Sequence, residues 1–375
     1  MRPKCGVGLP GSVIRPRAIR ASTGGVEALP QAGLRKNIRV PQGQAPITER
    51  TPGAGHSGSY TQCAGPDCPV GWRPEAECLR KPCYFRRSQR QTFPDMILIA
   101  DGGSTKCSWC QLDDTGHRVY FNTEGYNPDF IDTAGIAASL DHNLPDTLLR
   151  PDVREVHYYG AGVSSQAKAD VVGDALRHLF PKAVVFVTED LLAAARALLG
   201  RGPGFAAILG TGTNTCLYDG QRITYNVDSL GYFLGDEGSG SFIGKRLLRD
   251  YLRGLLPDGL QETFQTAYGL GSRNDILDRL YNQPLPNRFL ASFAKFAYDH
   301  NNVSYCREIV VEGFDTFFKN LVLHYPNYQD FTFNCVGSVG YNFRDALTQV
   351  AKHYQMEVGK ITRSPIDDLV SYHEG

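Results

Sequence analysis

The sequence contains two copies of one pattern, in which an apolar strand enters a turn of glycines and hydroxyl residues and a second strand follows at once. The first copy is Met-Ile-Leu-Ile-Ala-Asp-Gly-Gly-Ser-Thr-Lys-Cys-Ser-Trp-Cys at 96–110, and the second is Phe-Ala-Ala-Ile-Leu-Gly-Thr-Gly-Thr-Asn-Thr-Cys-Leu-Tyr at 205–218. Such turns bring backbone N–H groups and hydroxyls close to phosphate oxygens. Either turn alone is also explained by a structural β-hairpin. The pair indicates a duplicated domain with a nucleotide in the cleft between the copies.

The first 95 residues differ in composition from the rest of the chain. They contain 12 prolines, 12 glycines and 15 Lys/Arg against 6 Asp/Glu, whereas residues 96–375 contain 24 Lys/Arg against 33 Asp/Glu. The zero net charge of the chain is therefore a cancellation of +9 by −9. Because Pro and Gly make up about a quarter of residues 1–95 and no apolar period is present, we expect a disordered or spurious extension there.

Three interpretations of this extension compete. A transit peptide would be Arg-rich, as the segment is, but also amphipathic and rich in serine. A nucleic-acid-binding arm would need clustered basic residues, and here they are scattered. We favour the third interpretation, in which the reading frame was opened too far upstream and the protein starts at Met96, directly before its first core strand.

The ten cysteines divide evenly at Met96. The upstream pairs Cys63–Cys68 and Cys78–Cys83 resemble a zinc site, but their inner spacing lacks the usual knuckle turn. Downstream, Cys107 and Cys110 have the spacing of a redox motif but lie along a predicted strand, so we expect ordinary buried thiols. No secretory signal or membrane-spanning apolar run is present, and we expect a cytoplasmic, reducing location.

Short apolar strands alternate with helical patterns after Met96. Strands are predicted at 97–100, 108–112, 119–122, 155–159, 183–187 and 331–336, in addition to the second copy of the repeated pattern. Helices are predicted at 131–143, 166–179, 238–248 and 343–353, with more helices within 257–300. This order indicates an α/β fold with two domains, at 96–205 and 206–375.

Three polar residues at the ends of predicted elements are candidates for the chemistry. Asp190 follows a strand and opens a helix that Thr188 is expected to cap; there a carboxylate can act as a base or simply interact favourably with the helix dipole. Asp236, in Gly-Asp-Glu-Gly-Ser, can accept hydrogen bonds from sugar hydroxyls or cap the next helix. Asn127 begins an Asn-Pro turn that can present its side chain to a ligand.

The ordered motifs resemble those of the actin, sugar kinase and heat-shock ATPase superfamily. Asp-Gly-Gly-Ser-Thr-Lys at 101–106, Leu-Gly-Thr-Gly-Thr-Asn at 209–214 and Val-Gly-Ser-Val-Gly at 336–340 are similar to its first phosphate, second phosphate and adenosine motifs. Leu-Gly-Tyr-Phe-Leu-Gly-Asp-Glu-Gly-Ser at 230–239 resembles the sugar-binding signature of the N-acetylglucosamine kinases and their relatives, the activase-type ATPases. The resemblance covers Met96 to about His373 and implies two actin-like (ribonuclease H-like) domains with a nucleotide cleft between them.

The resemblance also implies a role for each matching residue. The residues implied to hold ATP are Asp101, Gly103, Ser104, Thr105, Lys106, Gly212, Thr213, Asn214, Gly337, Ser338 and Gly340. Asp101 would also associate with Mg²⁺, Asp190 would be the catalytic base, and Asn127 and Asp236 would hold sugar hydroxyls. The implied reaction is direct phosphoryl transfer from ATP to an amino sugar, with N-acetylglucosamine favoured as acceptor.

Two alternatives within this fold stay open. An activase-type ATPase would use a cluster-ligating cysteine at a dimer interface, but no cysteine after Met96 lies in an exposed Gly-rich loop of the predicted elements. A catalytically silent sugar sensor would not need Asp190. We therefore expect an enzyme with ATP and an amino sugar as partners, and no nucleic-acid or membrane partner. The sequence leaves open which sugar and hydroxyl react and whether two copies form a homodimer.

A chain that begins at Met96 should retain the properties of the full chain, because the bias toward Pro, Arg and Gly ends at that residue. We expect the same unfolding temperature by calorimetry and the same rate of ATP turnover in a coupled assay. A lower or less cooperative thermal transition in the shortened chain would contradict this expectation.

Overall fold

The computed structural model describes residues 96–103, 105–148 and 150–375. All of them fall within the second of the two units into which the chain divides, which spans Phe85–Gly375. Three predictions therefore lie outside the described residues. They are the nature of residues 1–95, the two upstream cysteine pairs, and the phosphate contact of Ser104.

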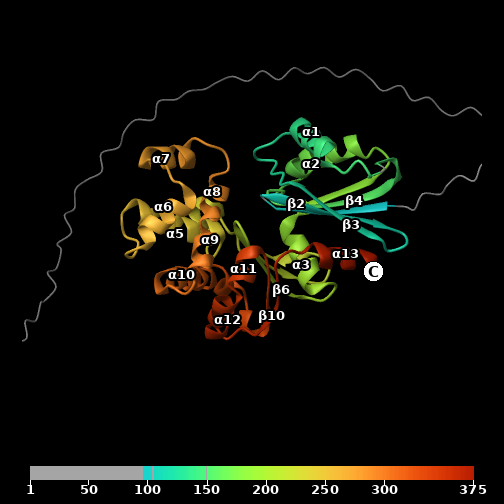
Figure 1. The fold of residues 1–375 in the computed structure, drawn as a ribbon. Helices are drawn as coiled ribbons and strands as arrows, with labels where there is room; N and C mark the ends of the chain where they lie inside the picture. The colour runs from blue at the N-terminus through green and yellow to red at the C-terminus, as the bar shows by residue number, and fades with distance from the viewer. Residues whose placement is uncertain (1–95, 104, 149) are drawn as a thin grey trace, which may run out of the picture. The chain divides into compact units, whose positions relative to one another are not determined.

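Two five-stranded sheets with the same strand order form the framework (Figure 1). The first consists, from edge to edge, of β3 (Arg118–Glu124), β2 (Lys106–Asp113), β1 (Met96–Gly102), β4 (Val153–Gly160) and β5 (Val184–Glu189). The second consists of β8 (Ile223–Tyr225), β7 (Thr213–Tyr218), β6 (Gly204–Leu209), β9 (Phe333–Val336) and β10 (Val358–Thr362). In each sheet the first three strands form an antiparallel meander and the last two are added in parallel. This repeated topology confirms the predicted duplication and the α/β fold class.

The parallel pairing aligns the carboxyl ends of three strands in the first sheet. Gly102 at the end of β1 is opposite Gly160 at the end of β4, and Gly160 is opposite Glu189 at the end of β5. In the second sheet, Ile208 of β6 is opposite Val336 of β9 in the same way. The turns that follow these strands therefore start from one edge of each sheet, which is where open α/β sheets bind ligands.

Four helices contact the first sheet or its helices. They are α1 (Thr133–Asn143), α2 (Gln166–Leu179), α3 (Asp190–Leu199) and the C-terminal α13 (Ile366–Glu374), with a short 3₁₀ helix η1 (Arg150–Asp152) before β4. Helix α3 packs on β1, β4 and β5 and also on β6, β7 and β9, so it contacts both sheets. Helix α13 lies beside α3 and packs on β1 and β2 (Figure 1).

The remaining helices follow the strands of the second sheet. Between β8 and β9 lie α4 (Gly231–Leu234), α5 (Gly240–Leu252), α6 (Leu260–Tyr268), α7 (Arg273–Tyr281), α8 (Pro286–Ser292), α9 (Ala294–Asp299), α10 (Ser304–Asn320), η2 (Val322–His324) and η3 (Tyr328–Asp330). After β9 come α11 (Ser338–Asn342) and α12 (Arg344–His353). The helices expected within 257–300 are confirmed. No helix in the described part of the chain is long and apolar enough to cross a membrane.

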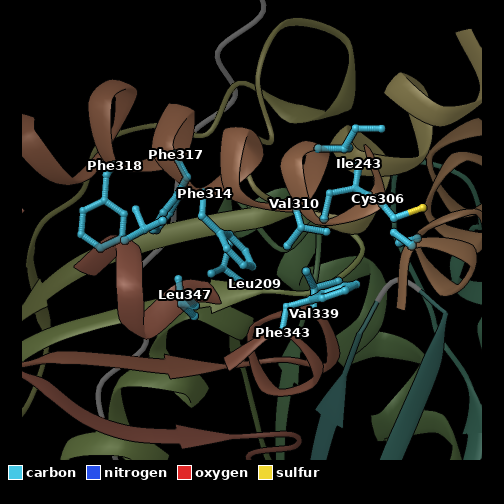
Figure 2. Packing of buried hydrophobic residues seen from close by; sticks show 14 of the residues in the cluster. Leu209, Ile243, Cys306, Val310, Phe314, Phe317, Phe318, Val339, Phe343 and Leu347 are labelled. Atoms are coloured by element: carbon cyan, nitrogen blue, oxygen red, sulfur yellow. The ribbon is translucent and has the colours of Figure 1, made fainter. Parts of the chain in front are cut away.

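The largest buried apolar cluster connects α10 to the second sheet (Figure 2). Val310, Phe314 and Phe317 of α10 recur at helical spacing and form one buried face. Leu209, the last residue of β6, belongs to the same cluster. Because Leu209 directly precedes the second glycine turn, packing in this core also fixes where that turn begins.

Neither the cap expected of Thr188 nor the cap considered as the alternative role of Asp236 is formed. Thr188 does not cap α3, because pairing with β4 keeps β5 extended as far as Glu189, which takes the N-cap position without a side-chain hydrogen bond. Asp236 does not cap α5. Ser239 does so, and its hydroxyl accepts a hydrogen bond from the N–H of Phe242 at 3.2 Å.

Replacing Phe314 by alanine should lower the free energy of unfolding by about 3–5 kcal/mol, since it leaves a cavity in a closely packed core. The matched control is Phe130→Ala, because that ring is 62% exposed; we expect a change within about 0.5 kcal/mol. Chemical denaturation of the two variants provides the comparison. Equal losses of stability would show that the α10 core does not hold the second sheet together.

Candidate functional site

The first glycine turn is held by backbone contacts at the end of β1. Gly103 N–H donates to the carbonyl of Lys106 at 3.0 Å, which closes the turn. The carbonyl of Gly102 accepts a hydrogen bond from Ala161 N–H at 2.7 Å. The turn after β1 is thereby tied to the turn after β4, and Asp101 lies beside both.

Asn127 lies next to these two turns. Gly125 N–H donates to the carbonyl of Thr105 at 3.3 Å, so the loop that carries Asn127 is attached to the first turn. The side-chain oxygen of Asn127 accepts from Asp129 N–H at 2.9 Å and faces Gly162, where an added Cβ would be 2.4 Å from it. A side chain at residue 162 would therefore displace Asn127.

Two carboxylates share the environment at the ends of β1 and β5. Burial raises the pKa of Asp101 to about 7, with a further contribution from the negative charge of Asp190, while Lys106 lowers it. Burial also raises the pKa of Asp190 to about 6; Glu189 adds to this increase, and the backbone N–H groups of Leu191 and Asp190 lower it. The structure thus brings the predicted Mg²⁺-associated acid and the predicted base into electrostatic contact.

The second turn is supported by the start of α5. Gly240 N–H donates to the carbonyl of Gly210 at 2.8 Å, and Ser241 N–H donates to the carbonyl of Thr211 at 3.0 Å. Asp236 reaches the same turn, where its Oδ1 accepts from Thr213 N–H at 3.1 Å.

Asp236 is only 7% exposed and has a backbone φ of 55°, a left-handed conformation that costs energy for a residue other than glycine. Burial raises its pKa to about 6, the Thr213 N–H lowers it, Glu237 raises it and Lys245 lowers it. Its Oδ2 accepts no hydrogen bond from the described residues. An unpaired carboxylate oxygen on a largely buried residue is suited to accept a hydrogen bond from a ligand.

The third turn contacts the second directly. Gly337 has a φ of 128°, and an added Cβ would lie 2.3 Å from the carbonyl oxygen of Leu209. Ser338 and Gly340 follow in α11. Asn214 is already engaged, because its side-chain oxygen accepts from Thr215 N–H and from the Asn226 amide, both at 3.0 Å.

Two further residues at the site were missed by the sequence analysis. The hydroxyl of Tyr158 is buried and has no hydrogen-bond partner among the residues that the structure describes. Burial, together with Cys107, Tyr126, Asp101 and Asp190, raises its pKa well above the ordinary value. Arg288 of α8 donates from Nη2 to the carbonyl of Gly125 at 3.3 Å, and its buried Nε finds no acceptor in the described part of the chain. No motif marks either residue, and an unpaired cation inside a predicted helix would have been the only signal for Arg288.

The acidic pair is suited to a cation but does not form a complete metal site. No group of three or more His, Cys, Asp or Glu in the described ranges could hold a metal ion. Mg²⁺ in kinases is held by one or two carboxylates, with phosphate oxygens and water as the other ligands. Asp101, whose pKa is raised by burial and by Asp190, fits such a role in its ionised form.

A cavity of about 290 Å³ adjoins Glu189 and therefore the start of α3. Its lining includes Val163, Ser164, Ser165, Gln166, Thr188 and Glu189. The hydroxyl of Thr188 is buried and has no hydrogen-bond partner within the described ranges.

No protein-family model and no curated protein sequence matches this chain. Among solved structures, a proposed N-acetylglucosamine kinase from Porphyromonas gingivalis is 40% identical; the match covers 74% of this chain and 98% of that one, with a TM-score of 0.70. The chain belongs to the N-acetylglucosamine kinase-like family. A second proposed N-acetylglucosamine kinase, from Chromobacterium violaceum, is 15% identical over 75% of this chain and 99% of its own, with a TM-score of 0.56, and shares the fold.

Family membership agrees with the placement of the thiols. All five described cysteines are free and buried, as predicted, and four of them lie in strands of the two sheets. In this member of the kinase-like family the thiols are therefore part of the core.

Asp101→Asn should stabilise the protein at pH 8 but not at pH 4. The folded-state pKa of Asp101 is about 7 against 3.8 for the free group, so the folded protein binds the extra proton between these values and stability falls as pH rises through them. In metal-free buffer the variant should gain about 1–3 kcal/mol in unfolding free energy at pH 8. Asp114→Asn, in the exposed turn after β2, is the control; an equal gain there would refute the assignment.

Proposed function

We propose that the protein is an ATP-dependent kinase of an amino sugar, with N-acetylglucosamine as the favoured acceptor. The observation that carries this proposal is the position of Asp190. It is a partly buried carboxylate at the first residue of α3, at the edge where β1 and β5 end, and its charge raises the pKa of Asp101. The similarity to a proposed N-acetylglucosamine kinase over almost the whole length of that protein supports the choice of acceptor.

The nucleotide would be held by three turns. Gly103, Thr105 and Lys106 belong to the first, Gly212, Thr213 and Asn214 to the second, and Gly337, Ser338 and Gly340 to the third. When bound beside Asp101, Mg²⁺ would neutralise negative charge on the phosphate oxygens. Lys106 is exposed and forms no ion pair with the described residues, so its ammonium group is free to bind phosphate.

Asp190 would act as the base. Its pKa of about 6 leaves it mostly ionised near neutral pH, yet close enough to neutrality for it to accept a proton efficiently. It would take the proton from the sugar hydroxyl that attacks the phosphate. Exclusion of water from the site would strengthen the electrostatic effects on this step.

Asp236 and Asn127 would bind the sugar. The free Oδ2 of Asp236 can accept a hydrogen bond from a hydroxyl, and the side-chain amide of Asn127 can donate one. Arg288 would act as a positioning residue, because its hydrogen bond to Gly125 connects α8 to the loop that carries Asn127.

We also propose that the chain divides into two domains at about residue 205, although the C-terminal helix α13 packs back on the first sheet.

Asp190→Asn and Asp236→Asn should separate the base from the sugar ligand. Asp190→Asn can still form a hydrogen bond with the hydroxyl but cannot take its proton, so kcat should fall by roughly a hundredfold or more with little change in sugar affinity. Asp236→Asn alters a contact made in both ground and transition state, so it should mainly raise KM, by an amount equal to about 1–3 kcal/mol of binding.

Steady-state kinetics with N-acetylglucosamine and glucose as acceptors would test the pair. Asp258→Asn, an exposed acid ahead of α6, is the matched control and should behave like the parent. If Asp190→Asn retained near-normal turnover, the base assignment would be wrong. If the parent phosphorylated neither sugar but bound one by calorimetry, the sensor alternative would be favoured.

A further inference from the structure

A second cavity of about 290 Å³ lies between the carboxyl end of α3 and the C-terminal helix α13. Its lining includes Arg196, Gly200, Arg201, Asp368, Ser371 and Tyr372. Helix α3 begins at Asp190, and a rise of 1.5 Å per residue places Arg196 about 9 Å further along the helix axis. The cavity is therefore separate from the turns and carboxylates of the proposed kinase site.

Two guanidinium groups contact the same aromatic ring in the wall of this cavity. The guanidinium carbon of Arg196 is 5.0 Å from the ring centroid of Tyr372, and that of Arg201 is 4.8 Å from it. Cation–π contacts of this kind hold a guanidinium in place while leaving its N–H groups in the plane able to donate. Both guanidinium groups are thus positioned by the same side chain.

Neither arginine has a carboxylate partner among the described residues. Arg196 donates from Nη1 to the Tyr159 hydroxyl at 2.6 Å, and its Nε is buried with no acceptor in the described part of the chain. Arg201 forms no ion pair within the described ranges. A bound anion would supply both cations with an ion-pair partner.

The acidic side chains of α13 form ion pairs or hydrogen bonds with residues other than the two arginines. Asp368 lines the cavity but pairs with Lys360 at 2.7 Å. Glu374 accepts a hydrogen bond from Nε of Arg118 at 2.9 Å, and Asp367 contacts the Tyr120 hydroxyl. Gly375 also lines the cavity, and within the described residues no carboxylate, that of Gly375 included, forms an ion pair with Arg196 or Arg201.

The lowered pKa of His373, the residue after Tyr372, agrees with positive charge near the cavity. Burial lowers the pKa of His373 to about 3, with further contributions from His157, Arg196 and Arg201. The ring is therefore neutral at physiological pH, and it shares a hydrogen bond of 2.9 Å with the Tyr159 hydroxyl.

We propose that this cavity is a binding site for a small phosphate-bearing anion. Arginine pairs bind phosphate through several charge-assisted hydrogen bonds, and here two guanidiniums are already held in place by Tyr372. Ligand pockets usually start at about 300 Å³, so the cavity suits inorganic phosphate or a small phosphate ester rather than a nucleotide. The proposal does not depend on the kinase activity proposed above.

Calorimetric titration of the full chain with inorganic phosphate, at constant ionic strength, would test the site. We expect binding that Arg201→Gln weakens by about tenfold or more, since it removes a charge-assisted contact from an exposed residue whose loss should not disturb folding. Arg253→Gln, at the exposed end of α5, is the matched control and should bind as the parent does.

Lys106→Gln distinguishes this cavity from the first phosphate turn, because it should leave unchanged the part of the binding that Arg201→Gln removes. A parallel titration with N-acetylglucosamine 6-phosphate shows whether a phosphate ester is also accepted. Binding of either ligand that depends on Arg201 and not on Lys106 supports the proposal. Absence of binding up to about 10 mM for both ligands, or loss of binding in Lys106→Gln with none in Arg201→Gln, overturns it.

Discussion

The proposed site depends on the parallel pairing of β1, β4 and β5. This pairing places Gly102, Gly160 and Glu189 in one row, so that the three chains leave the sheet side by side. Asp101 and Asp190 are brought together by the row, although they lie far apart in the sequence. A shift of one residue in either pairing would turn alternate side chains to the other face and separate the two carboxylates.

The ionised acids of the proposed site lower the stability of the folded protein. Asp101, Asp190 and Asp236 all have a pKa raised by burial, which means that the folded protein disfavours their ionised forms. Sites that bind substrates and cations commonly retain such groups, because the ligand supplies the missing partner. The unpartnered hydroxyl of Tyr158 belongs to the same pattern.

Helix α3 connects the features on which both proposals rest. Its first residue is Asp190, its middle packs on strands of both sheets, and Arg196 near its end lines the cavity against α13. The repeated strand order explains why one helix reaches both sheets. In each sheet a helix follows the strand at one edge. The helix that follows β5 of the first sheet, α3, leads directly to β6 of the second sheet.

The sequence by itself determined the two glycine turns, the duplication of the strand–turn–strand pattern, the position of Asp190 at a helix start and the burial of the downstream cysteines. Each of these follows from local periodicity or from a contiguous motif. Only the tertiary structure decided that Ser239 caps α5 in place of Asp236, that Arg288 reaches Gly125, and that Arg196 and Arg201 share Tyr372. These contacts join residues that no local pattern relates. They depend on register and helix packing, and the pKa of each acid depends on burial, which is a property of the folded chain.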